Sequence, residues 1–218
     1  MKKVVLSPSK LSLFKECPRC FWLDVNKGVR RPEGIFSSLP NGMDLVLKRH
    51  FDAYRGKGLP PDIKGKLKGR LFEDMDKLRV WRNNFKGLDH EDKASGAILK
   101  GALDDLFVTE DGLHVPLDFK TRGFPLKENT HEHYQHQMDI YCFLLERNGL
   151  RTGDFACLLF YYPLAAEGNG MFRFECDIVR IKTDKKDGER LFLDAVKVLD
   201  GEEPASSGEC AWCGWNKN

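Results

Sequence analysis

The 218-residue sequence has no long apolar stretch, little excess of charge of one sign and no internal repeat. A helix that crosses a bilayer needs about 20 consecutive apolar residues, so no membrane span is expected. The apolar part of Met1–Leu6 is too short for a signal peptide, which predicts a cytoplasmic protein without membrane contact. The formal net charge is only +2, so a nucleic-acid-binding surface would need local clustering. The basic run Lys64–Arg70 is either such a cluster or a solvated loop.

Four of the seven cysteines form two C-x-x-C pairs at opposite ends of the chain, Cys17 with Cys20 and Cys210 with Cys213. Cytoplasmic cysteines are reduced, so the pairs predict one four-cysteine metal site that clips the N-terminal region to the tail. A thioredoxin-like role fits poorly because neither pair follows a strand of a βαβ unit. Spacing alone does not distinguish Zn²⁺ from a 4Fe-4S cluster. The other three cysteines lie in apolar segments and are expected in the core: Cys142, Cys157 and Cys176.

Hydrophobic periodicity alternates between helical and strand patterns along the chain. The order predicts an α/β fold, a central mixed β-sheet flanked by helices, within a single domain over 1–218. Segments 1–40 and 201–218 would form the cysteine clasp. Helices are predicted near 7–18, 41–56, 71–84, 131–147 and 186–199, and strands over 97–108, 113–120, 155–162 and 172–176.

The turn Asp111-Gly112 separates two apolar segments and predicts a β-hairpin. A three-residue loop with Gly112 in the left-handed conformation would place Asp104 directly opposite Asp118. Facing carboxylates repel each other, and a bound cation removes that cost. Lys120 lies two residues beyond Asp118 and projects from the same sheet face. Two acids and one ammonium with open positions suit Mg²⁺ or Mn²⁺.

Such an ion can polarise a phosphodiester and lower the pKa of a bound water. Lys120 could orient that water, help to deprotonate it or stabilise the developing charge. The plainer interpretation is that Asp118 and Lys120 form a surface ion pair and that Asp104 and Asp105 cap an edge. Asp105 is the competing acid, although strand alternation puts it on the face opposite Asp104.

At these residues the sequence resembles the RecB-like branch of the PD-(D/E)XK nuclease superfamily. This branch includes the AddB helicase-nucleases and the CRISPR-associated iron–sulfur exonucleases. The similar motifs follow the order of the family nearly from end to end. They are Leu6-Ser7-Pro8 with Cys17-Pro18-Arg19, Gly42 to His50, Gly101-Ala102-Leu103-Asp104, Asp118-Phe119-Lys120-Thr121, and Gln137 to Tyr141.

The resemblance implies a restriction-endonuclease-like core with a Mg²⁺ or Mn²⁺ site. The implied metal ligands are His50, Asp104, Asp118 and the carbonyl of Phe119, and Asp104, Asp118 and Lys120 are the implied catalytic residues. Gln137 and Tyr141, neighbours at i and i+4 on one helix, would contact DNA. By periodicity alone, His50 is a packed core histidine and Tyr141 a core residue.

The resemblance also favours a 4Fe-4S cluster at Cys17, Cys20, Cys210 and Cys213, with Zn²⁺ as the alternative. Many relatives join one N-terminal cysteine to three C-terminal ones. This chain departs from that pattern, because it offers two and two, with Cys20 where relatives often have a basic residue.

The implied function is a metal-dependent deoxyribonuclease, an exonuclease rather than an endonuclease, acting on single-stranded DNA or DNA ends. The chain has no helicase motif, so unwinding would come from a partner protein in DNA repair or CRISPR adaptation. One alternative is a non-catalytic DNA-binding or assembly module of such a complex. Another is a redox or iron-sensing protein, which would leave the hairpin acids without a role.

Overall fold

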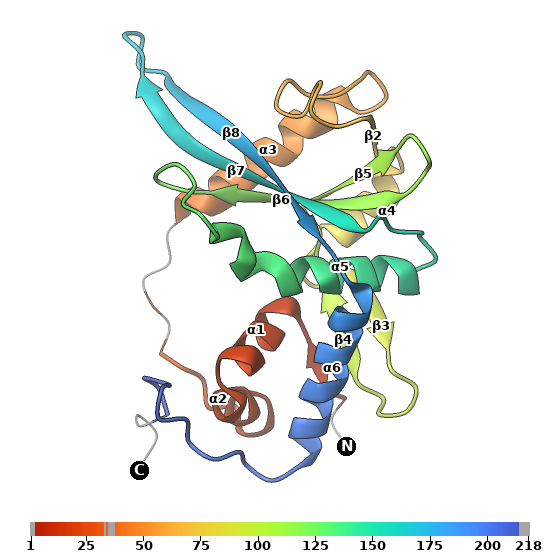
Figure 1. Ribbon diagram of the computed structural model, residues 1–218, viewed down its shortest axis with the longest axis vertical. Helices are drawn as coiled ribbons and strands as arrows, with labels where there is room; N and C mark the ends of the chain where they lie inside the picture. The colour runs from red at the N-terminus through yellow and green to blue at the C-terminus, as the bar shows by residue number, and fades with distance from the viewer. Residues whose placement is uncertain (1–2, 33, 35–37, 214–218) are drawn as a thin grey trace.

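The computed structural model describes residues 3–32, 34 and 38–213, which form two β-sheets with helices packed against them (Figure 1). The larger sheet has five strands in the order β2-β5-β6-β7-β8, and only the β6–β7 pair is parallel. Its strands are β2 (Gly69–Leu71), β5 (Asp105–Thr109), β6 (His114–Thr121), β7 (Phe155–Ala166) and β8 (Phe172–Lys182). The smaller sheet, in the order β1-β4-β3, consists of β1 (Val5–Leu6), β3 (Leu88–Glu91) and β4 (Ile98–Gly101).

Helices cover both faces of the five-stranded sheet, as Figure 1 shows for α3 (Ser38–Tyr54) on one side and α5 (Gln135–Arg147) on the other. Successive strand residues point to opposite faces. On β7, Leu159 packs into the core that contains Phe51 of α3. Its neighbour Leu158 packs into the core of α5 and α6 (Lys185–Asp200). The expected mixed α/β fold with a helix-flanked sheet is therefore confirmed.

The hairpin β5–β6 has the predicted register. Asp105 pairs with Leu117 and Val108 with His114, and Thr109 N–H donates to the carbonyl of Leu113, which leaves a three-residue loop, 110–112. Gly112 adopts the left-handed conformation with φ of 77°, which favours glycine because it has no Cβ. Asp104 directly precedes the first paired residue, Asp105, so the same register read one residue further would set it opposite Asp118.

The continuous strand predicted over 97–108 is wrong. Its first part is β4 of the small sheet and its second part is β5 of the large one. The intervening backbone is held from outside both sheets, since Tyr141 Oη donates to the carbonyl of Ala102 and Leu103 N–H donates to the carbonyl of Trp81. These bonds satisfy polar groups that a strand would have paired. Because of this break, one apolar segment contributes a strand to each of the two sheets.

Most other predicted elements are present with altered ends. Helix α1 (Pro8–Glu16) starts where expected, and the Ser7 side chain accepts from Lys10 N–H. Helix α3 starts before the predicted 41–56, and strand β7 continues past Tyr162 into a long hairpin with β8 (Figure 1). The helix predicted over 71–84 is only α4 (Met75–Trp81), and that over 131–147 is a 3₁₀ turn, η2 (Thr130–Tyr134), followed by α5.

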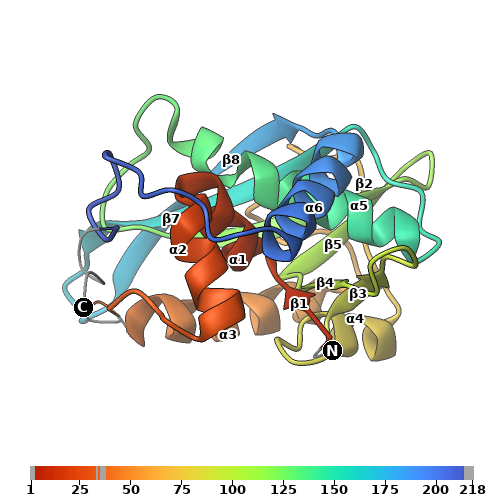
Figure 2. The ribbon, with the colours of Figure 1, turned by 90° about the horizontal axis from the view of Figure 1, so that it is seen from below.

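The two ends of the chain meet around α2 (Pro18–Trp22) and the short π-helical turn η1 (Leu23–Lys27), and Figure 2 shows the tail passing beside them. Arg19 pairs with Glu203 at 2.7 Å, and Trp22 Nε1 donates to the carbonyl of Gly201 at 3.1 Å. Among the helices described, none combines the length and apolar composition that crossing a bilayer requires.

Candidate functional site

Asp104, Asp118, Lys120 and Gln137, here named the acidic site, lie together where α5 crosses β6. Lys120 Nζ is 2.5 Å from Asp118 Oδ2. The Gln137 side chain bridges the two, because its Nε2 donates to Asp118 Oδ1 and its Oε1 accepts from Lys120 Nζ, both at 3.2 Å. The structure thus joins the strand residues and the helix residue that sequence motifs singled out.

Asp104 precedes β5 and is held on three sides. Its Oδ2 accepts from Phe119 N–H at 2.9 Å, and its Oδ1 lies 3.0 Å from Lys48 Nζ. Arg82 Nε donates to its backbone carbonyl at 2.7 Å. The Asp104 carboxylate is therefore anchored beside the backbone of β6, where its charge acts on Asp118. No sequence pattern marks Lys48 or Arg82 as a site residue, since their roles depend on how α3 and α4 pack.

The electrostatics of the acidic site suit a cation. Burial and the neighbouring charge of Asp104 raise the pKa of Asp118 to about 7. Burial by itself would lower the pKa of Lys120, but the adjacent Asp118 outweighs it and raises that pKa. Asp118 Oδ2 is buried and, within the described chain, pairs with Lys120 without accepting a hydrogen bond of good geometry. A buried carboxylate oxygen with spare acceptor capacity fits a metal ligand.

Two tyrosines support these groups. Tyr141, nearly buried on α5, accepts from Gln137 Nε2 at 2.9 Å while donating to the carbonyl of Ala102. The ring of Tyr134 lies over Lys120 Nζ, 4.5 Å from it, in a cation–π contact. Tyr141 therefore positions Gln137, and the DNA contact suggested for both residues stays a prediction.

His50 pairs with Asp62, an acid that sequence motifs do not mark, and its assignment as a metal ligand stays a prediction. Its Nε2 is 2.8 Å from Asp62 Oδ2, and its ring packs edge-on against Tyr54. Within the described residues, neither His50 nor Asp44 forms, together with Asp104 and Asp118, a group of ligand atoms that all lie within 4.8 Å of one another. The α3 residues at Asp104 are instead Lys48 and Asp44, which pair with each other at 2.7 Å. Burial and Asp104 raise the pKa of Asp44.

Asp105 is a structural acid on the opposite strand face, as alternation predicts. It is fully buried, with both carboxylate oxygens within 2.8 Å of Arg55 Nη2 and one at 3.0 Å from Arg82 Nη2. Because Arg82 also holds the carbonyl of Asp104, the buried ion pairs orient the backbone that presents the site acid. The contacts assign Asp104, rather than Asp105, to the acidic site.

The four predicted cysteines do come together, and Cys17, Cys20, Cys210 and Cys213 are here named the cysteine group. All four Sγ atoms lie within 4.8 Å of one another, with 3.4 Å between Cys17 and Cys213 and 3.6 Å between Cys20 and Cys210. Such a group could bind Zn²⁺ or an iron–sulfur cluster. Four ligands about 2.3 Å from a tetrahedral ion lie about 3.8 Å apart, which is close to the observed spacing.

Cysteine binds a metal as the thiolate, and the thiols of the cysteine group differ in pKa. Burial raises the pKa of Cys17 to about 12. For Cys210, the backbone N–H of Trp212 and the neighbouring thiols outweigh burial and lower the pKa to about 6. Arg31 Nη2 also donates to Cys210 Sγ at 3.3 Å, so a positive charge faces the group.

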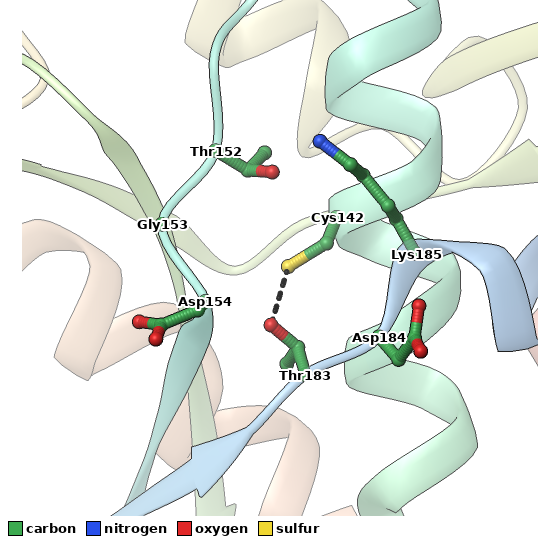
Figure 3. Close-up of a pocket in the computed structure, with 7 residues that line it drawn as sticks. All are labelled: Cys142, Thr152, Gly153, Asp154, Thr183, Asp184 and Lys185. Carbon is green, nitrogen blue, oxygen red and sulfur yellow. Dashed lines mark hydrogen bonds between the residues drawn. The ribbon is translucent and has the colours of Figure 1, made fainter.

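A separate pocket of about 180 Å³ lies between α5, the start of β7 and the start of α6 (Figure 3). Its lining includes Asp154, Lys185 and Cys142, whose thiol donates to Thr183 Oγ1 at 3.5 Å. None of the residues predicted for a site lines it. Cys142, like Cys157 and Cys176, is a buried core residue, as the sequence predicts.

No family model matches the chain, and no curated protein sequence matches it. Among solved structures, the chain is similar to one described as the crystal structure of SSO0001, with 14% sequence identity and a TM-score of 0.46. That similarity covers 98% of this chain and 84% of the other. A similarity at this level says nothing about activity.

Proposed function

We propose that the chain is a metal-dependent nuclease of the PD-(D/E)XK type, with a restriction-endonuclease-like core, that hydrolyses DNA phosphodiester bonds in single strands or at ends. One observation supports it most directly. Asp104, Asp118 and Lys120 lie at one place, Gln137 bridges two of them, and a buried carboxylate oxygen retains acceptor capacity. A surface ion pair would not need that burial or that support.

The ligands for Mg²⁺ or Mn²⁺ would be Asp104, Asp118 and the carbonyl of Phe119, with His50 as the fourth ligand that the resemblance implies. The ion, when bound, supplies a Lewis acid and a more acidic water. Lys120 Nζ, held by Gln137 and Tyr134, donates a hydrogen bond to a phosphate oxygen or orients the attacking water. Phe119 N–H keeps Asp104 aimed into the site.

The test compares the wild-type chain with Asp118→Ala and Lys120→Ala on labelled single- and double-stranded DNA with Mg²⁺ or Mn²⁺. We expect the wild type to cut and both variants to lose most of the activity. Asp111→Ala, in the turn of the same hairpin, is the matched control and should cut normally. Equal cleavage by all four proteins would refute the assigned site.

A non-catalytic DNA-binding module is the second candidate, and one observation favours it. Each acid already has a lysine partner, Lys48 for Asp104 and Lys120 for Asp118, so the charges balance without an ion. Binding of DNA by the wild type without any cleavage would support this candidate over the nuclease.

For the cysteine group we propose a metal centre that clasps the two chain ends. The resemblance favours a 4Fe-4S cluster, whereas the sulfur spacing favours one Zn²⁺. In a four-iron cluster each thiolate binds a different iron, so the sulfurs lie farther apart than around a single ion. Either centre would be structural, since the cysteine group and the acidic site share no residue.

A further inference from the structure

A groove of about 620 Å³ opens beside the acidic site, between α3 and the turn that follows α4, and is here named the α3–α4 groove. Asp104 and Phe119 are among its lining residues, so the groove is continuous with the acidic site. The rest of its lining is mainly polar and includes Asn41, Arg79 and Asn84. A chain bound in the acidic site can therefore continue along it.

Three cationic side chains line this groove, and that of Arg79 is the most exposed of them. Lys48 and Arg82 are committed to Asp104 and Asp105, with side chains that are largely buried. Arg79 instead pairs with Asp76 at 3.3 Å, and both side chains are mostly exposed. Exposed pairs of this kind contribute little stability, so the guanidinium can turn to a phosphate at small cost.

Phe85 directly follows two lining residues of the groove and is 87% exposed. Hydrogen bonds hold the backbone of its turn, because Asn83 Oδ1 accepts from the backbone N–H groups of Phe85 and Lys86, and Lys100 Nζ donates to the carbonyl of Phe85. A phenyl ring with this exposure is available to stack against a flat partner. The nucleic-acid bases are such partners.

We infer that the α3–α4 groove and Phe85 form a subsite for single-stranded DNA, in which an unpaired base stacks on Phe85 and the adjoining phosphate contacts Arg79. The inference rests on the proposed function for the position of the scissile bond. It adds the position of the bound DNA strand and the reason why that DNA must be single-stranded. A paired base in a duplex is already stacked between its neighbours and cannot offer its face to the ring.

The test measures binding of a fluorescein-labelled oligothymidylate by anisotropy, with EDTA present so that no strand is cut. Phe85→Ala should weaken binding about tenfold, whereas Phe85→Trp should retain it and Phe85→Leu should not, because stacking needs a ring. Phe172→Ala is the matched control, an exposed phenylalanine on the β7–β8 hairpin, and should bind as the wild type does.

Arg79→Ala should reduce the slope of log affinity against log salt by about 0.7, the contribution of one single-strand phosphate. Arg190→Ala is its control, since Arg190 is an arginine of similar exposure with an Asp partner three residues away on α6. Unchanged binding by Phe85→Ala, or no oligothymidylate binding by the wild type, would overturn the subsite even if the enzyme cuts DNA. Phe85-dependent binding without cleavage would uphold the subsite and count against the nuclease.

Discussion

Asp118 is an acid that the fold keeps out of water and close to a second acid. Its pKa of about 7 is well above the roughly 3.9 of an unfolded aspartate. Between these values the native chain binds a proton that the unfolded chain has released. In the metal-free protein, this group therefore contributes stability at low pH that is lost as the pH rises towards 7.

We predict that Asp118→Asn makes the metal-free protein more stable than the wild type at pH 8, by roughly 1–3 kcal/mol, because the amide carries no buried charge. At pH 4 the two proteins should unfold alike. Urea denaturation in EDTA at both pH values measures this, with Asp111→Asn as an exposed control on the same hairpin. A variant that is less stable than the wild type at pH 8 would show that the Asp118 charge is well compensated.

For single residues, sequence motifs identified the members of the acidic site but not all of the residues that contact them. Asp104, Asp118, Lys120 and Gln137 could be chosen because short motifs and strand alternation mark them. Lys48 could not, since its contact with Asp104 depends on how α3 is rotated about its axis. The same rotation leaves His50 beside Asp62.

At the scale of elements, α6 packs closely against α5 at Gly188. A Cβ placed there would lie 2.7 Å from the carbonyl oxygen of Asp139. That oxygen belongs to the backbone of α5, the helix that carries Gln137, and cannot rotate away. By contrast, a Cβ at Gly101 would meet the ends of two side chains, Leu144 and Tyr141, at 2.9 and 3.1 Å.

We predict that Gly188→Ala lowers the free energy of unfolding by about 1–3 kcal/mol, as overpacking does, and that Gly101→Ala has a smaller effect. Gly42→Ala is the matched helical control. Gly42 lies in α3, and a Cβ added to it would meet no atom within 4 Å, so alanine should stabilise the helix by up to about 1 kcal/mol. Chemical denaturation of the three variants would contradict the packing argument if Gly188→Ala proved neutral.

The boundary between β4 and β5 could not be predicted from the local hydrophobic pattern. The apolar run over 97–108 has the composition of one strand, but Tyr141 and Trp81 hold its middle and divide it between two sheets. Neither partner is close in sequence, so no window around residue 102 could have revealed the break.

At the scale of the whole molecule, the cysteine group joins both ends of the chain. Its members come from α2 and the preceding residue and from the C-terminal tail. Metal binding to such a group stabilises only the folded chain, because the ligands are far apart when the chain unfolds. The clasp and the acidic site should therefore respond to mutation independently.

We predict that Cys213→Ser removes the metal and lowers the melting temperature, while the folded fraction retains any DNA cleavage. Cys157→Ala, outside the group, should leave the metal content unchanged. Metal analysis of protein purified without oxygen identifies the centre. A brown protein containing iron indicates 4Fe-4S, and a colourless one with a single zinc per chain indicates Zn²⁺. Loss of cleavage in fully folded Cys213→Ser would contradict a structural role.

Local patterns in the sequence determined the hairpin register, the strand face of Asp118 and Lys120, and the grouping of four cysteines into two C-x-x-C pairs. Each follows from neighbours in the chain: Gly112 in the turn, alternation along a strand, and the C-x-x-C spacing. The tertiary structure alone decided that Lys48 of α3 pairs with Asp104, that His50 of the same helix pairs with Asp62, and that Arg82 holds the backbone of Asp104. Those contacts depend on how whole helices pack against the sheet, and no short stretch of sequence contains that information.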